Sequence, residues 1–246
     1  MVTELEVNGF KFEAFFTEKE IENIYIPFLK NMKKLREEKR ERIIIFLSAP
    51  PATGKSTLAL FLEKLSKEIS DVIPIQSLSL DGFHFNNHYL HSHKINFQGN
   101  ERFLYEIKGM PETYNLEEIK KSLKNIKNNN IKWPIYDRNL HEPEMDKIEV
   151  NADIILIEGN WLLLNEDNWR ELKALCDYSI FIEAQDSILK TRLIQRKIKG
   201  GLPLIDALEF YEITDRKNVL RVMNNRNSAD LTLEMLKSGE KIMKTI

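Results

Sequence analysis

Short apolar runs alternate with amphipathic segments along most of the chain. The most uniform run covers residues 43–47, and residues 58–65 after it repeat apolar side chains at helical spacing. Similar apolar runs predict three more strands, at residues 73–80, 154–157 and 178–182. Amphipathic patterns predict helices at residues 116–126, 169–175, 188–198 and 204–224. This alternation predicts an α/β fold with a parallel sheet flanked by helices and a ligand at the carboxyl ends of the strands.

The start of the chain follows a different pattern. Residues 2–16 predict a strand or a hairpin that turns at Asn8-Gly9. Thr17 and Glu20 have the spacing of a capping box, which predicts the first turn of a helix. We therefore expect residues 1–41 to form an appendage to one domain that spans residues 1–246.

Two smaller features are predicted within this domain. Residues 131–136 and 147–150 are short and more polar, and they predict a side hairpin. Residues 186–226 form a predicted lid region with the following helix, and Gly200-Gly201 provides a hinge for it.

The segment between the first core strand and its helix carries the clearest chemical signal. It reads Ala49-Pro50-Pro51-Ala52-Thr53-Gly54-Lys55-Ser56-Thr57. In a strand–loop–helix context this is a phosphate-binding loop, whose amide groups at residues 51–57 point at phosphate oxygens. Lys55 is expected to reach the β- and γ-phosphates, and the Ser56 hydroxyl to bind Mg²⁺. The chain is therefore predicted to bind a nucleoside triphosphate, with ATP and Mg²⁺ as cofactors.

One position departs from the usual loop pattern. Ala49 stands where the first glycine is expected. Alanine fits there if its φ angle stays negative, so the entry to the loop is expected to differ slightly from the usual one.

Two predicted strands end in an acidic residue. Asp81 follows the second strand and Glu158 ends the strand at residues 154–157. Beside a phosphate loop, a carboxylate can bind Mg²⁺ or accept a proton from an acceptor hydroxyl. We assign Glu158 to the metal and Asp81 to the base, the alternative being that each acid only caps the next helix.

The charge and residue composition limit the kinds of partner and cellular compartment that we expect for this protein. The formal net charge is −2, so a strongly basic nucleic-acid surface is not expected. Cys176 is the single cysteine, which fits a reducing cytoplasm. No apolar run is long enough to span a membrane, and neither nucleic acid nor membrane is an expected partner.

Four motifs occur in a recognisable order. They are Asp81-Gly82-Phe83-His84, Lys108-Gly109-Met110-Pro111-Glu112-Thr113-Tyr114, Pro134-Ile135-Tyr136-Asp137 and Glu158-Gly159-Asn160-Trp161-Leu162-Leu163-Leu164. Together with the loop they resemble the phosphoribulokinase, uridine kinase and bacterial-type pantothenate kinase group of P-loop kinases. The resemblance is strongest to its nucleoside/nucleotide kinase-like branch, which includes kinases associated with fructose transport. It covers roughly residues 43–233 and implies transfer of the ATP γ-phosphate to a hydroxyl of a small molecule.

The resemblance also implies roles for single residues. Asp81 matches the catalytic acid of the group. Tyr136 and His141 match a tyrosine and a histidine near the acceptor in uridine kinases. Arg192 and Arg196 match lid arginines, and their spacing of four lets them converge on the transferred phosphoryl group.

Three further residues are candidates for binding the acceptor. His84, three residues after Asp81, is expected to orient the acceptor, although a metal site with His88 is an alternative. Arg102 and Lys108 are candidates for an anionic group of the acceptor, or they are ordinary surface charges.

The acceptor itself stays open at this stage. Gly109 stands where uridine kinases carry an aspartate that binds ribose, which argues against a nucleoside. A sugar or polyol is the preferred acceptor, followed by pantothenate-like and nucleoside compounds. A nucleotide-dependent regulatory ATPase without an acceptor is the alternative function. Many members of the group form dimers, so a homodimer is compatible with the resemblance.

Overall fold

The computed structural model describes residues 1–7, 10–97 and 99–244, and the predicted turn at Asn8-Gly9 lies outside these ranges. The chain divides into two compact units. The first comprises Met1–Leu78 and Ala152–Ile246, and the second Ser79–Asn151.

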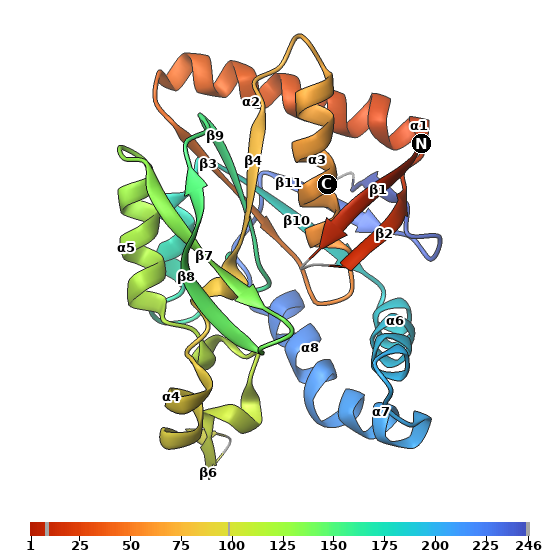
Figure 1. Cartoon of the computed structure of the whole chain (residues 1–246). Coiled ribbons are helices and arrows are strands. Elements are labelled where there is room, and N and C mark those ends of the chain that lie inside the picture. Colours follow the sequence, from red (N-terminus) through yellow and green to blue (C-terminus); the bar gives the residue numbers. More distant parts are fainter. Residues whose placement is uncertain (8–9, 98, 245–246) are drawn as a thin grey trace. The chain divides into compact units, whose positions relative to one another are not determined.

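The first unit contains a six-stranded sheet with the order β12-β11-β10-β3-β9-β4. Strand β3 pairs in parallel with β9 and β10, β10 pairs in parallel with β11, and β12 is antiparallel to β11. The sheet is therefore mostly parallel, which confirms the predicted fold class (Figure 1). Its strands are β3 (Ile43–Ser48), β4 (Ile75–Ser79), β9 (Ile154–Glu158), β10 (Tyr178–Ala184), β11 (Leu231–Met235) and β12 (Lys241–Met243).

Helices and one hairpin complete this unit. The predicted capping box is present, because Thr17 Oγ1 accepts the Glu20 amide while the Glu20 carboxylate accepts the Thr17 amide. From Glu20 the helix runs through a π-helical turn into α2, whose first turn contains Pro27. These elements are β1 (Val2–Val7), β2 (Phe10–Phe15), α1 (Glu18–Glu20), the π turn Ile21–Tyr25, α2 (Ile26–Lys39), α3 (Lys55–Glu68), α6 (Asp186–Lys199), α7 (Leu204–Phe210), the π turn Tyr211–Asp215 and α8 (Arg216–Asn224).

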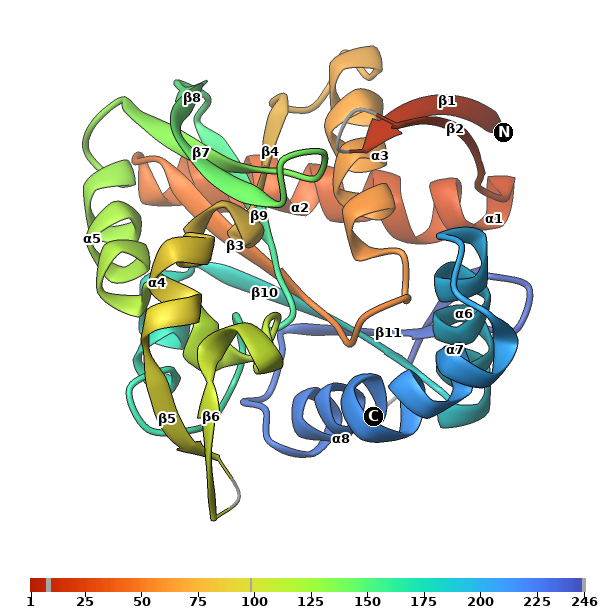
Figure 2. The ribbon, with the colours of Figure 1, turned by 60° about the horizontal axis from the view of Figure 1, so that its bottom comes forward.

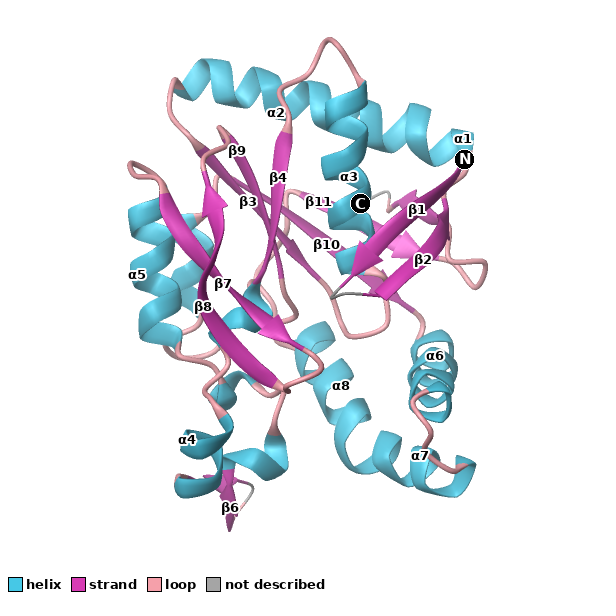
Figure 3. Cartoon of the chain, viewed as in Figure 1, coloured by secondary structure: helices cyan, strands magenta, loops and turns pink. Residues whose placement is uncertain are grey.

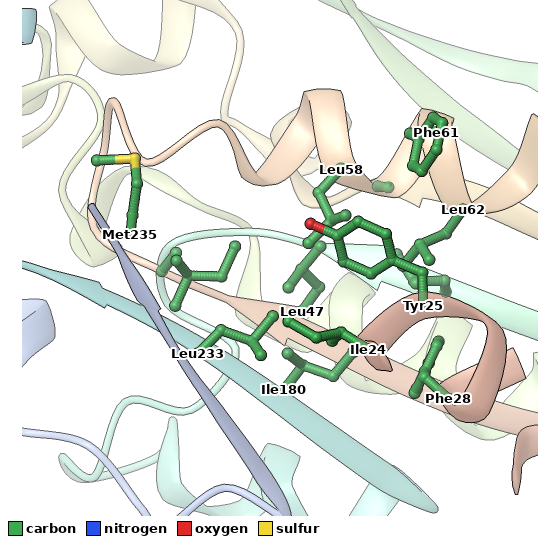
Figure 4. Packing of buried hydrophobic residues seen from close by; sticks show 14 of the residues in the cluster. Ile24, Tyr25, Phe28, Leu47, Leu58, Phe61, Leu62, Ile180, Leu233 and Met235 are labelled. Carbon is green, nitrogen blue, oxygen red and sulfur yellow. The ribbon is translucent and has the colours of Figure 1, made fainter. Parts of the chain in front are cut away.

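The core of this unit lies between the sheet and its helices. All residues of β3 and β9 are buried, as expected for central strands of a parallel sheet. Figure 4 shows the side chains of Leu58 and Leu62 from α3 above Leu47 of β3 and Ile180 of β10. This packing fixes the start of α3, and with it the loop that precedes the helix.

Two predicted helices differ in detail from the sequence expectation. Residues Arg170–Leu175 form a 3₁₀ helix instead of an α-helix. The helix predicted at residues 204–224 consists of α7, a π-helical turn and α8. Gly201 precedes α7 with a φ angle of +95°, a conformation that suits glycine. Figure 2 shows α6, α7 and α8 following one another along the chain, over the residues predicted to form a lid.

The second unit is built around the antiparallel pair β7–β8, which is the predicted side hairpin. A 3₁₀ turn at Leu80–Phe83 packs beside β7, so closely that a methyl group added to Gly82 would lie 2.4 Å from the Pro134 carbonyl oxygen. Its other elements, visible in Figure 3, are α4 (Asn87–Ser92), β5 (Lys94–Phe97), β6 (Asn100–Phe103), the 3₁₀ turns Leu104–Ile107 and Pro111–Thr113, α5 (Leu116–Ile126), β7 (Ile131–Asp137) and β8 (Glu142–Val150).

Candidate active site

The phosphate-binding loop joins β3 to α3 as predicted. Helix α3 begins at Lys55, directly after Gly54, whose φ angle of +80° lets the backbone turn sharply into the helix. Inside the loop, the buried Thr53 hydroxyl donates to the Pro50 carbonyl at 3.0 Å. The first amides of α3 therefore face the loop, where the helix dipole favours an anion.

The conformational strain of the loop lies at Ala52 and not at Ala49. Ala49 is fully buried, and its φ angle stays outside the left-handed region, as its role at the loop entry requires. Ala52 adopts a φ angle of +69°, which is unfavourable for a residue with a Cβ atom. Substitution of the first glycine by Ala49 is thus compatible with the loop.

Lys55, Ser56 and Glu158 meet at the end of the central strands. Glu158 is the last residue of β9 and lies beside Leu47 of β3. Its carboxylate accepts the Ser56 hydroxyl at 3.0 Å and lies 3.7 Å from Lys55 Nζ. A hydroxyl and a carboxylate are oxygen ligands of the kind Mg²⁺ prefers, with phosphates and water completing its shell. These residues therefore fit both a phosphate group and its magnesium ion.

Arg192 and Arg196 line a cavity beside the loop. The cavity measures about 400 Å³ and includes Ala52 and Gly54 of the loop. Arg196 is exposed, whereas Arg192 is half-buried with Nη1 2.8 Å from Met235 Sδ, and burial lowers its pKa. The two predicted lid arginines are thus on the same side of the loop but in different environments.

A second cavity adjoins the loop and was not anticipated from the sequence. It measures about 360 Å³ and is bounded by the N-terminal segment, the loop, Arg192 and the turn between β11 and β12. Glu20 lines it and is 2% exposed. Glu20 accepts hydrogen bonds at 2.9 Å from the Tyr25 hydroxyl and from the Lys241 amide, which joins the appendage to the last strand. The capping-box pattern predicted that Glu20 begins a helix, but it did not indicate that Glu20 would contact Tyr25 and Lys241.

In the second unit, Asp81 lies in the 3₁₀ turn that follows β4. Its Oδ1 accepts a hydrogen bond from the Tyr114 hydroxyl at 3.2 Å, and its Oδ2 is 4.0 Å from Arg138. Neither Tyr114 nor Arg138 was predicted from the sequence as a site residue. Tyr114 ends one of the four motifs and Arg138 follows another, so their positions were the only available signal.

His84 packs among aromatic rings next to this carboxylate. Its ring centroid is 3.8 Å from that of Tyr114 and 5.4 Å from that of Tyr136. Burial lowers the pKa of the His84 imidazole from 6.5 to about 4, so the ring is neutral near pH 7. Its Nδ1 has no partner and is available to a ligand. Because α4 begins only at Asn87, His84 does not share a helical face with His88, which removes the geometric basis of the metal alternative.

Lys108 joins the same group, whereas Arg102 contacts a different part of the unit. Lys108 Nζ donates to Asn87 Oδ1 at 2.7 Å and to the His141 carbonyl at 3.0 Å, and it lies over the Tyr136 ring. His141 thus contributes its main chain, while its side chain is exposed. Arg102 lies on β6, 3.7 Å from Glu106. The structure therefore brings His84, Lys108, Tyr136 and His141 together, and Arg102 has its ion pair elsewhere.

Known proteins resemble this chain over most of its length. YggC of Escherichia coli K12, itself uncharacterised, is 41% identical over 240 residues, covering 97% of this chain and 98% of YggC. C227.14 of Schizosaccharomyces pombe, provisionally named a uridine kinase, is 28% identical over 211 residues. The matched region covers 80% of this chain and 85% of C227.14. No family model matches the sequence.

A solved structure agrees with these relatives. A kinase from Silicibacter sp. TM1040, provisionally assigned to a fructose transport system, is 29% identical with a TM-score of 0.72, covering 83% of this chain and 98% of that one. The chain belongs to the phosphoribulokinase, uridine kinase and pantothenate kinase group of P-loop kinases. The resemblance stated from the four motifs and the loop is confirmed. In this P-loop kinase family member the phosphate loop lies between a central strand and a helix.

Within residues 1–7, 10–97 and 99–244, no helix is long and apolar enough to cross a bilayer.

Proposed function

We propose that the protein is an ATP-dependent kinase that transfers the γ-phosphate to a hydroxyl of a small, sugar-like metabolite. Pantothenate-like and nucleoside acceptors are the next candidates. The observation that carries this proposal is the meeting of Lys55, Ser56 and Glu158 at the phosphate loop. Such an arrangement serves phosphoryl transfer, in which positioning and neutralisation of charge provide most of the catalysis.

The first unit would bind Mg²⁺·ATP. The loop amides and Lys55 would hold the phosphates, and Ser56 and Glu158 would hold the metal ion, which would supply positive charge to neutralise the phosphates. The 360 Å³ cavity lined by Thr53, Gly54 and the appendage has the size and position for the base and ribose. Half-buried Arg192 borders this cavity, so we assign it to the nucleoside side of ATP. Exposed Arg196 is the better candidate for closing over the γ-phosphate.

The second unit would activate the acceptor. Asp81 accepts the proton of the acceptor hydroxyl, whose oxygen bonds to the γ-phosphorus while the bond to the ADP oxygen breaks. The hydrogen bond from Tyr114 and the nearby Arg138 keep the Asp81 carboxylate oriented. Neutral His84 offers Nδ1 to a hydroxyl, and Lys108 and Tyr136 line the same place.

The test is coupled ADP release with a panel of hexoses, pentoses, polyols, sugar phosphates, nucleosides and pantothenate. We expect acceptor-dependent turnover that falls about 100-fold or more in Asp81→Asn, because the amide cannot accept the proton. Asp146→Asn makes the same change at an exposed site of the second unit and should leave turnover unchanged. ATP turnover that ignores every acceptor and survives Asp81→Asn would instead identify a regulatory ATPase.

A further inference from the structure

The helical segment over residues 204–224 of the first unit is exposed along one side. It consists of α7, the π-helical turn and α8, which follow one another without a break (Figure 2). Its buried side carries Ala207, Tyr211, Asp215, Asn218 and Val222. The residue two positions before each of these is exposed, and residues two apart point to nearly opposite sides of a helix. We call these exposed residues the exposed stripe; they are Ile205, Glu209, Ile213, Arg216 and Leu220.

The exposed stripe is apolar at both ends and in its middle. The exposed fractions are 77% for Ile205, 52% for Ile213 and 41% for Leu220. Leu204 and Leu208, also in α7, are exposed as well. Single exposed apolar side chains are common on proteins, but a group of them on one surface marks a place where another molecule binds. The exposed stripe is therefore a candidate contact surface.

The charges of the segment are separated along its length. Residues 204–215 contain acidic residues and no basic ones, whereas residues 216–224 contain basic residues and no acidic ones. The helix dipole favours this order only in the first and last turns of a helix. Acidic residues here continue to Glu212 and Asp215 in the middle of the segment, so the dipole does not account for the arrangement.

This order of charges makes the exposed stripe complementary to itself. Ile205 and Glu209 lie eight and four residues before Ile213, and Arg216 and Leu220 lie three and seven residues after it. Two copies packed antiparallel through Ile213 would therefore set Glu209 of each copy against Arg216 of the other. The same packing sets Ile205 against Leu220. A two-fold interface requires this property, because one surface serves both copies.

Other arrangements fit the charges less well. A parallel pairing of two copies would set like charges against each other. A membrane surface or a nucleic acid is negatively charged, and the exposed carboxylates of Asp206, Glu209 and Glu212 would be repelled by it. Within one copy, Arg216 lies 3.8 Å from Glu212 in an exposed ion pair. Such a pair contributes little to stability, so Arg216 can exchange it for Glu209 of a second copy.

We propose that the exposed stripe joins two copies of this chain into an antiparallel, two-fold dimer. The inference does not depend on the proposed kinase function. One helical segment from each copy forms a small interface, so the dissociation constant should lie in the micromolar range, roughly 1–100 μM.

The first test is sedimentation velocity over protein concentrations that bracket this range. We expect a monomer–dimer equilibrium for the wild type. Ile213→Glu should raise the dissociation constant about tenfold or more, because two carboxylates would meet near the two-fold axis. Leu140→Glu makes a similar change at a side chain of the second unit that is 60% exposed, and it should leave the dissociation constant unchanged.

The second test exchanges the two charges of the exposed stripe. Glu209→Arg and Arg216→Glu should each raise the dissociation constant about tenfold or more, because each sets like charges against each other twice. The double variant restores opposite charges and should return the constant to within about threefold of the wild-type value. All three positions are exposed, so melting temperatures measured on the monomers should stay unchanged, which separates loss of the dimer from loss of the fold.

Three results would overturn the proposal. The first is a wild-type protein that stays monomeric at every concentration; if hydrogen exchange then still shows the exposed stripe protected, the second unit of the same chain covers it. The second is a dimer that survives Ile213→Glu, which would place the interface elsewhere. The third is a double variant that stays as weak as the single ones, which would contradict the antiparallel packing. Each leaves the kinase proposal intact, because that proposal is tested by acceptor-dependent turnover.

Discussion

At the scale of single residues, the departure from the phosphate-loop motif at Ala49 did not indicate which loop residue has an unfavourable backbone conformation. The sequence drew attention to Ala49, because it replaces a glycine. The structure shows that Ala49 has an ordinary backbone, while Ala52 carries the left-handed conformation at a φ angle of +69°. No pattern of side chains encodes a φ angle, so this difference appears only once the loop is closed between β3 and α3.

This contrast gives a prediction with opposite signs at two alanines. Ala52→Gly should raise the free energy of unfolding by up to about 1 kcal/mol, because glycine relieves the strain at a small cost in chain entropy. Ala49→Gly should lower it by about 0.5–1 kcal/mol, since its φ angle needs no glycine. Urea denaturation of both variants measures the two changes. If both are destabilising to the same degree, Ala52 is not strained.

At the scale of elements, the period of the apolar pattern located four strands of the six-stranded sheet, β3, β4, β9 and β10, but not β11 or β12. It did not locate the 3₁₀ turn at Leu80–Phe83, which holds Asp81 and depends on contact with β7, more than fifty residues later in the chain. The π-helical turns at Ile21–Tyr25 and Tyr211–Asp215 were also missed. A π turn has the same amphipathic appearance as an α-helix over a short window, so hydrophobic spacing cannot separate them.

The close contact between this turn and β7 can be tested with Gly82→Ala. The added methyl group would lie 2.4 Å from the Pro134 carbonyl oxygen and would push the turn away from the strand. We expect a loss of about 2–3 kcal/mol in the free energy of unfolding, the range for overpacking. Gly200→Ala is the control, because its nearest atom is 3.3 Å away and its φ angle is −78°. Equal effects of the two substitutions, measured by urea denaturation, would contradict the contact.

At the scale of the whole molecule, the candidate residues for nucleotide binding and those for acceptor binding belong to different compact units of the chain. The first unit contains the phosphate loop, Glu158, Arg192 and Arg196, and the second contains Asp81, His84, Lys108 and Tyr136. A ligand of the native first unit should therefore stabilise the protein without any acceptor, since binding to the folded state shifts the unfolding equilibrium.

We expect a non-hydrolysable ATP analogue with Mg²⁺ to raise the melting temperature by roughly 5–10 °C at a hundred times its dissociation constant. Lys55→Met should abolish most of this shift, because Lys55 is expected to contact the phosphates. Lys67→Met, which removes a lysine that is 58% exposed on the same helix, should keep it. A full shift in Lys55→Met, measured by differential scanning fluorimetry, would exclude this lysine from the nucleotide site.

The sequence by itself determined the fold class, the phosphate loop and most of the chemical groups, because these depend on local patterns and on residue types at fixed spacing. The amino-acid sequence alone was enough to predict four candidate site residues, namely Lys55, Ser56, Asp81 and Glu158. The tertiary structure decided which groups meet: Glu158 with Ser56, Tyr114 with Asp81, and the appendage with the last strand through Glu20. It also decided which side of the helical segment over residues 204–224 is exposed. Burial and pairing arise from contacts between distant segments, and a linear pattern does not contain them.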